Sequence, residues 1–402
     1  MHDTIACSLT TPTIVANRRQ VMIVPISLYI NLENTLISRE LFPSMLSGNP
    51  GSYINAFETM HPDIALIAPA KDWVMLALAN PKSIELLKRK KIAIMPTLFS
   101  HMLPDAFPEA LAAQFLISEQ ILKRLFENII WQGIIPENTV SSSIVPFVKR
   151  HWQGATLSIG HNNLRGLETG DYFLRDHCGA GVDLQVIANS KARLKYMEMY
   201  RELHPANEVI REMNNLDRNH SCLFDFERPW SNIVYYPHEG ITPPRMDIWH
   251  QFQGALLSHE VSSWKVQVNT NKPSLYLDPA DLDMWNNKES FWLIDIQKEV
   301  ISQSLGKGDY FELAALVATS SMPPRVLTRF MNDDSFPSSY KDKSGIVDLV
   351  GDVAKVQELL TICKNIKQRR RIDYGSEFLP AGQQVYLRLL HESLEWIDRI
   401  LL

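Results

Sequence analysis

Short apolar runs alternate with longer amphipathic stretches through the first two thirds of the chain. Most of these runs are almost continuously hydrophobic, which is typical of strands covered on both faces in a parallel sheet. The predicted strands cover residues 21–30, 64–69, 92–99, 128–135, 155–160, 171–174 and 221–226. Helical spacing covers residues 81–90, 108–128 and 189–204. This order predicts an α/β protein with a parallel sheet, and both an open doubly wound sheet and a closed barrel fit it.

The pattern changes after about residue 240. Residues 241–290 are rich in Pro, Trp, Asn and Asp, and they are predicted to form loops and short irregular pieces. From residue 291 onward the spacing becomes helical. The predicted organisation is therefore an N-terminal extension over residues 1–19, an α/β domain over 20–290, and a C-terminal helical domain over 291–402.

Composition narrows the functional classes. The 402 residues carry a net charge of −5, so no general basic field suggests nucleic acid as a partner. No apolar run has the length of a membrane span, no secretory signal is apparent, and no GxGxxG or GxxxxGK[ST] motif follows the first strand. Four scattered cysteines fit neither a disulfide framework nor a zinc site. Isolated thiols fit a reducing compartment, so we expect a cytoplasmic protein.

Polar residues follow most of the predicted strands. Because ligands of parallel α/β proteins bind at the carboxyl ends of the strands, these residues are candidates for a polar cleft. Two of them are unusual, since Glu137 directly follows "IIP" and Asp225 lies inside "CLFDFE", where an apolar layer is expected. Two facing carboxylates can share the work of glycoside hydrolysis. Glu227 is a rival to Asp225, because residues two apart on a strand point the same way.

The other candidates are expected to bind substrate. Trp230 belongs to an aromatic stretch that could stack on sugar rings, although packing is the commoner role of such residues. No HExxH, HxxxH or Cys/His cluster indicates a metal site. The full set of candidate substrate-binding residues is Glu33, Asn34, His101, His161, Arg175, Asp176, Glu227 and Trp230.

Several segments resemble, in the same order, motifs of glycoside hydrolase family 57. "GIIPENTVSSSIVPFV" is similar to the segment with the catalytic nucleophile, which maps to Glu137, and "LFDFERPW" to the segment with the general acid, which maps to Asp225. "PTLFSHMLPDAF" maps a further motif to His101, and "DYFLRDHCGAG" maps another to Arg175 and Asp176. "LVATSSMPPRVL" resembles a motif of a C-terminal helix, and the resemblance spans roughly residues 20–335.

The resemblance implies a (β/α)7-type barrel of parallel strands followed by a C-terminal helical bundle. It implies a retaining enzyme that acts on α-glucans or a related oligosaccharide, without a metal or an organic cofactor. The chain departs from the family pattern at four places. Glu33-Asn34 replaces His-Gln-Pro after the first strand, Ile134 replaces a Trp, Arg228-Pro229 replaces Phe-Gly, and Ser321 replaces an Asp.

Three other functions stay open. The chain could be a carbohydrate-binding protein that has lost catalysis on the same barrel, which the altered positions favour. It could be a polysaccharide deacetylase, although such enzymes need a metal and a pair of His at helical spacing, which is missing. It could also be an interaction protein. The sequence leaves undecided the sugar, the oligomeric state, the choice between hydrolase and transferase, and which of Asp225 and Glu227 faces Glu137.

Overall fold

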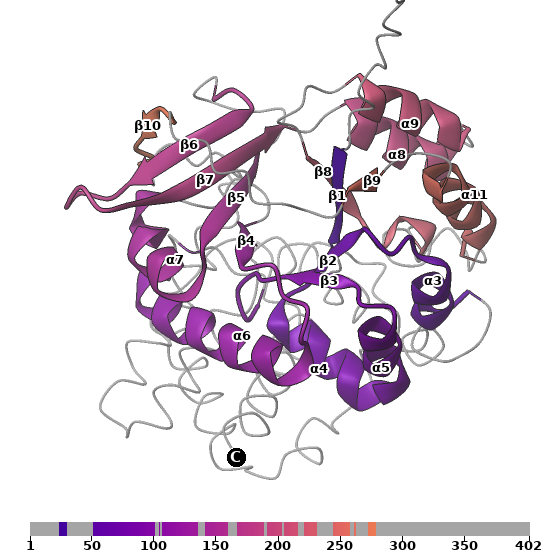
Figure 1. Cartoon of the computed structure of the whole chain (residues 1–402), viewed down its shortest axis with the longest axis horizontal. Helices are drawn as coiled ribbons and strands as arrows, with labels where there is room; N and C mark the ends of the chain where they lie inside the picture. The colour runs from indigo at the N-terminus through magenta and orange to yellow at the C-terminus, as the bar shows by residue number, and fades with distance from the viewer. Residues whose placement is uncertain are drawn as a thin grey trace, which may run out of the picture.

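The computed structural model describes residues 24–29, 51–100, 104, 107–135, 141–159, 167–188, 191–202, 205–215, 221–230, 244–257, 261–262 and 272–278. Within these residues the chain forms two largely parallel sheets with helices packed outside them (Figure 1). The predicted extension over 1–19 and the predicted helical domain over 291–402 lie outside the described residues.

The first sheet is formed by parallel strands in the order β3-β2-β1-β8. A short strand, β9, also pairs with β1 in parallel. The strand bounds are Val24–Tyr29 for β1, Ala65–Ile67 for β2, Ala93–Met95 for β3, Cys222–Asp225 for β8 and Val261–Ser262 for β9. All the main strands lie inside predicted runs, so the sequence pattern is confirmed here.

The second sheet has the order β10-β6-β7-β5-β4. Its strands are β4 (Gln132–Ile135), β5 (Gly154–Ile159), β6 (Gly170–Arg175), β7 (Gly181–Ala188) and β10 (Ser274–Leu275). The pairs β4–β5 and β5–β7 are parallel, but β6 and β7 form an antiparallel hairpin. This hairpin corrects the expectation of parallel strands throughout, and β7 was not among the predicted strands.

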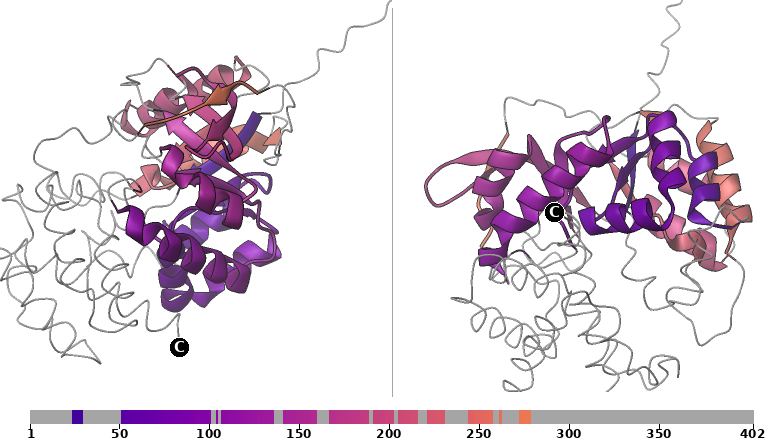
Figure 2. Two further views of the ribbon diagram at one scale, coloured as in Figure 1. Left: turned by 90° about the vertical axis from the view of Figure 1, so that its left-hand side faces the viewer. Right: turned by 90° about the horizontal axis from the view of Figure 1, so that it is seen from below.

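Helices cover the outer faces of the sheets (Figures 1 and 2). They are α3 (Tyr53–Thr59), α4 (Ala70–Ala79), α5 (Pro81–Arg89), α6 (Leu111–Leu125), α7 (Val145–His151), α8 (Lys191–Glu202), α9 (Ala206–Asn214) and α11 (Met246–Leu257). Single 3-10 turns form at η2 (Pro108–Ala110), η3 (Ser142–Ile144) and η4 (Arg228–Trp230). The helix α11 corrects the prediction that residues 241–290 form only loops and short pieces.

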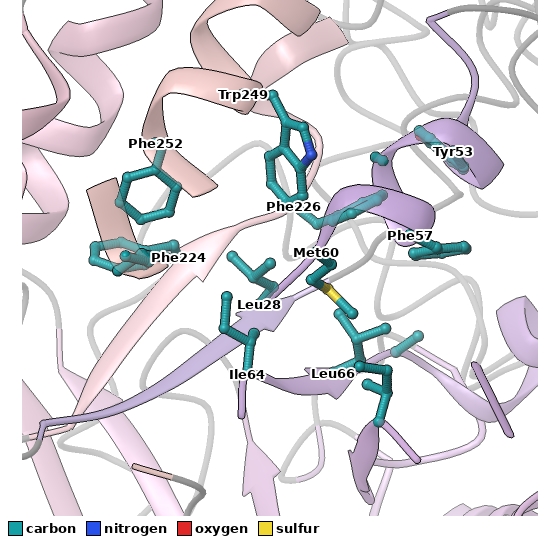
Figure 3. Packing of buried hydrophobic residues seen from close by; sticks show 14 of the residues in the cluster. Leu28, Tyr53, Phe57, Met60, Ile64, Leu66, Phe224, Phe226, Trp249 and Phe252 are labelled. Atoms are coloured by element: carbon teal, nitrogen blue, oxygen red, sulfur yellow. The ribbon is translucent and has the colours of Figure 1, made fainter. Parts of the chain in front are cut away.

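Two large hydrophobic clusters lie between the helices and the sheets. We call the first core the cluster that includes Leu28, Phe57, Leu66, Tyr196, Phe224, Phe226, Trp249 and Phe252. Figure 3 shows Phe224 beside Phe252 and Phe226 beside Trp249 in this core. We call the second core the cluster that includes Phe107, Phe115, Ile135, Val148, Trp152, Leu157, Leu184 and Val186. Helices α6 and α7 supply its outer side.

A third cluster joins the two sheets. Its members come from strands of both, namely Ala65, Ile67, Ala93, Met95, Ile134, Ile187 and Leu223, and we call it the shared cluster. Successive residues of a strand point to opposite faces, so Leu66 packs in the first core while Ile67 packs in the shared cluster. The segment just before β4 also forms a parallel bridge to β3, between Ile129 and Ile94. Strands β2, β3 and β4 are therefore buried on both faces, as their hydrophobic runs predict.

Candidate functional site

Asp225 is the last residue of β8 and lies at the carboxyl edge of the first sheet. The three residues before it are buried, and Asp225 pairs in register with Tyr29, the last residue of β1. Its side chain is 20% exposed, so the strand leaves the core at this carboxylate. Asp225 therefore lies where the buried strand ends, rather than within its apolar layer as the sequence suggested.

Two arginines hold the Asp225 carboxylate. Arg193, in the first turn of α8, donates from Nη2 to Oδ1 at 3.2 Å. Arg228, at the start of η4, donates to Oδ2 from Nε at 3.1 Å and from Nη2 at 2.8 Å. The two guanidinium side chains are 20% and 22% exposed. We call Arg193, Asp225 and Arg228 the arginine–aspartate cluster.

The arginines determine the protonation of Asp225. Burial alone would raise the pKa of its carboxyl, but the positive charges and hydrogen bonds of Arg193 and Arg228 outweigh burial and lower the pKa below its ordinary value. Asp225 is therefore a carboxylate at neutral pH. A general acid needs the opposite arrangement, in which its surroundings favour the protonated form.

The backbone at the end of β8 is fixed from α8. The hydroxyl of Tyr196 donates to the carbonyl oxygen of Asp225 at 3.2 Å, and its ring stacks on Phe224 with centroids 4.6 Å apart. Burial raises the pKa of this fully buried Tyr196, so the phenol stays protonated. Because α8 supplies both Tyr196 and Arg193, one helix positions the backbone and the side chain of Asp225.

Glu227 lies in a different environment from Asp225. The strand ends at Asp225, and the carbonyl oxygen of Glu227 already accepts from the amide of Trp230 at 2.9 Å in the following turn. The rule that residues two apart share a face therefore does not apply here. Glu227 is only 2% exposed, so Asp225 is the more accessible of the two carboxylates.

Trp230 is part of the first core and presents no face to a ligand. Its side chain is fully buried, its indole N–H donates to the carbonyl oxygen of Gly51 at 2.7 Å, and Tyr53 packs edge-on at 4.5 Å. This arrangement corrects the expectation that Trp230 stacks on a sugar. Packing, the commoner role of a Trp, is the role that the structure gives it.

Arg175 and Asp176 lie at the other edge of the second sheet. Because β6 runs antiparallel to β7, the carboxyl end of β6 lies beside the amino end of β7, with Arg175 paired to Gly181. The hairpin turn projects away from β8 in Figures 1 and 2. The expectation that Arg175 and Asp176 line the same cleft as Asp225 is therefore wrong.

Both residues have structural partners in the hairpin. Arg175 donates to the hydroxyl oxygen of Ser274 at 3.0 Å and to the carbonyl oxygen of Gly179 at 3.1 Å. Asp176 accepts from the amide of Cys178 at 2.9 Å, and Gly179 has a φ of 79°, which suits glycine. These contacts stabilise the turn and explain why two charged residues, Arg175 and Asp176, occur there.

Five candidates lie outside the described residues, and their roles stay predictions. They are Glu33, Asn34, His101, Glu137 and His161. The strand before Glu137 is described, and β4 ends at Ile135 in parallel with β5. The chain therefore leaves β4 at the same edge at which β5 and β7 end.

Two residues of the site carried little signal in the sequence. Arg193 lies on a helix with ordinary spacing, and nothing in that pattern links it to Asp225, which is 32 positions away. Arg228 stands out in the sequence only as a departure from the family pattern, although a cation three residues after a carboxylate is a signal for their pairing.

The described part of the chain shows neither a metal site nor a membrane span. It contains no group of three or more His, Cys, Asp or Glu residues that could hold a metal ion. No helix there has both the length and the apolar character needed to cross a membrane.

No protein-family model matches the chain, and no curated protein sequence matches it. Similar solved structures include 4-alpha-glucanotransferase from Thermococcus litoralis, with 13% identity, a TM-score of 0.49, and coverage of 92% of this chain and 59% of that one. They also include a protein in glycosyl hydrolase family 38 from Enterococcus faecalis, with 11% identity, a TM-score of 0.35, and coverage of 90% and 40%. This chain thus covers 59% and 40% of the two structures' own lengths.

Proposed function

We propose that this chain is a carbohydrate-active enzyme with a retaining two-carboxylate mechanism, acting on an α-glucan or a related oligosaccharide. The observation that supports it best is the position of Asp225, a partly exposed carboxylate at the carboxyl end of a buried parallel strand. Ligands of parallel α/β proteins bind at this edge. The resemblance of the segments around Glu137 and Asp225 to family 57 motifs supplies the class of substrate.

We also propose that the two sheets close into a (β/α)7-type barrel. The order would be β8-β1-β2-β3-β4-β5-β7, with β6 and β10 added outside the closed ring. The Ile94–Ile129 bridge supports the junction of β3 with β4. The hydrogen bond from the Ser221 hydroxyl to Gln185 at 3.2 Å and the packing of Ile187 with Leu223 support the junction of β7 with β8.

In the proposed mechanism, Glu137 attacks the anomeric carbon and forms a glycosyl-enzyme while the bond to the leaving oxygen breaks. Asp225 gives its proton to that oxygen and later takes a proton from water or from an acceptor sugar. The arginine–aspartate cluster opposes proton donation by Asp225, because Arg193 and Arg228 favour its carboxylate form. We therefore expect turnover of ordinary glycosides to increase toward acidic pH, where more Asp225 carries a proton.

A second candidate function is carbohydrate binding without turnover. The pairing of Asp225 with two arginines favours it, because a carboxylate held in this way can accept hydrogen bonds from sugar hydroxyls but gives up no proton.

Product analysis by mass spectrometry tests the enzyme proposal. Wild type, Glu137→Gln and Asp225→Asn would be incubated with maltooligosaccharides and a panel of other glycans at several pH values. Asp176→Asn is the matched control, since Asp176 lies in the hairpin turn at the opposite edge. We expect wild type and the control to shorten or redistribute a glycan, and both site variants to lose this activity.

The same experiment separates the two candidates. If wild type changes no glycan at any pH but binds one in calorimetry, and Glu137→Gln binds it equally well, the enzyme proposal fails and binding stands. Product lengths would distinguish a hydrolase from a glucanotransferase.

A further inference from the structure

Arg228 is both a departure from the family pattern and a direct partner of the proposed acid. Its guanidinium makes two hydrogen bonds to one oxygen of Asp225. Arg193 makes a further bond to the other oxygen. Both arginines are about a fifth exposed, so they lie at the surface of this edge rather than in the core.

This geometry changes the kind of leaving group that the site could expel. An alcohol oxygen leaving a sugar needs a proton from a general acid, and a carboxylate between two guanidiniums is a poor proton donor. A phosphate group leaves as an anion and needs no such proton. Guanidinium groups bind phosphate with paired, charge-assisted hydrogen bonds and stabilise the charge that develops on it.

We propose that the substrate at this edge is a glycosyl phosphate, and that Arg193 and Arg228 bind its phosphate leaving group. This inference rests on the proposed function, since it assumes that Asp225 lies beside the reacting carbon. Asp225 then acts as a positioning residue that orients the two guanidiniums.

The reaction balances without an added acid. The bond between the anomeric carbon and the phosphate oxygen breaks, and its electron pair leaves with the phosphate. A bond forms between that carbon and the Glu137 carboxylate. An acceptor hydroxyl then attacks the same carbon, the bond to Glu137 breaks, and the acceptor's proton passes to the released phosphate. The products are a lengthened glycan, or a free sugar if the acceptor is water, and inorganic phosphate.

Two measurements on the full-length protein test this inference. The first is calorimetric binding of inorganic phosphate. The second is phosphate release from a panel of sugar 1-phosphates, with and without an oligosaccharide acceptor. The variants are Arg228→Gln, Arg193→Gln and the charge-conserving Arg228→Lys. The matched control is Arg211→Gln, because Arg211 is a well-exposed arginine of α9 that lies 3.6 Å from the carboxylate of its neighbour Glu212.

We expect wild type to bind phosphate and to release it from a sugar 1-phosphate. Each glutamine variant should weaken phosphate binding about tenfold or more, Arg228→Lys should restore part of it, and Arg211→Gln should change neither measurement. Thermal melting of each variant shows whether the fold is kept. A purely structural ion pair would change the melting temperature and leave phosphate binding unaltered, which would overturn the inference.

The remaining outcomes separate this inference from the proposed function. Turnover of neutral oligosaccharides without phosphate binding would overturn the inference and leave the enzyme proposal standing. Phosphate binding that depends on Arg193 and Arg228, with no turnover of any glycan or sugar phosphate, would support the anion site and refute the enzyme.

Discussion

Gly133 lies in β4 under the indole of Trp152, and replacing it with alanine should be strongly destabilising. A Cβ at this position would lie 1.9 Å from Cε3 and 2.1 Å from Cζ3 of Trp152. Carbon atoms pack best at roughly 3.5–4.0 Å, so the indole or the strand would have to move by more than about 1.5 Å. Trp152 cannot move easily, because it belongs to the second core and packs against Phe115 with centroids 4.6 Å apart.

These contacts set limits on the magnitude. Overpacking a core costs roughly 1–3 kcal/mol and sometimes more, whereas losing a buried Trp side chain costs roughly 3–5 kcal/mol. The chain would adopt the less costly of the two responses. We therefore expect Gly133→Ala to lower the free energy of unfolding by about 3 kcal/mol.

The assay is equilibrium urea unfolding followed by far-UV circular dichroism. Gly170→Ala is the matched control, since Gly170 is also a strand glycine but its Cβ would meet only Tyr172 at an ordinary 3.7 Å. A double-mutant cycle with Trp152→Leu tests the cause, because the cost of Gly133→Ala should largely disappear once the indole is gone. If Gly133→Ala is as stable as the control, or costs the same without the indole, the reasoning is wrong.

Three further predictions concern other parts of the molecule. Lys90 donates to three carbonyl oxygens at the end of α3 at 2.7–3.0 Å, so Lys90→Met should cost about 1–3 kcal/mol in denaturant unfolding, while Lys88→Met, at an exposed ion pair, should cost less than about 1 kcal/mol. A Cβ at Gly254 in α11 would meet nothing within 4 Å, so Gly254→Ala should raise the free energy of unfolding by about 1 kcal/mol, and an unchanged or lower value would contradict this. The lowered pKa of Asp225 stabilises the fold above its unfolded-state pKa and ceases to do so as pH falls through the folded-state pKa; Asp225→Asn should therefore be less stable than wild type at pH 7, and a difference in melting temperature that does not narrow below about pH 4 would refute this.

The sequence predicts the main strands well because burial on both faces gives a continuous hydrophobic run. The prediction fails where such a run is missing. β7 alternates Val182, Leu184 and Val186 in the second core with polar residues between them, so it contains no continuous hydrophobic run and the pattern does not indicate a strand there. The helix α11 has helical spacing at Trp249 and Phe252, but the surrounding sequence is rich in Pro and Asn, which favours a prediction of loops.

The site was only partly predictable for a related reason. That Asp225 lies on an apolar strand follows from the local pattern, so it could be predicted. Arg175 pairs with Gly181 in the β6–β7 hairpin, and because β7 is not among the predicted strands, the sequence does not predict the antiparallel direction of β6. The contact between Arg193 and Asp225 depends on how α8 packs on β8, and no local pattern encodes that packing.

The two cores also differ in how much of the chain must be present before each can form. The second core draws almost entirely on residues 98–186, whereas the first joins residues before 127 to residues 192–256. In particular, β1 pairs with β8, about 200 positions later in the chain. Contacts between near neighbours close short loops and form early, while distant pairings form slowly. During synthesis we therefore expect the middle of this chain to fold before its beginning. β1 can complete its packing only after β8 and α11 have been synthesised.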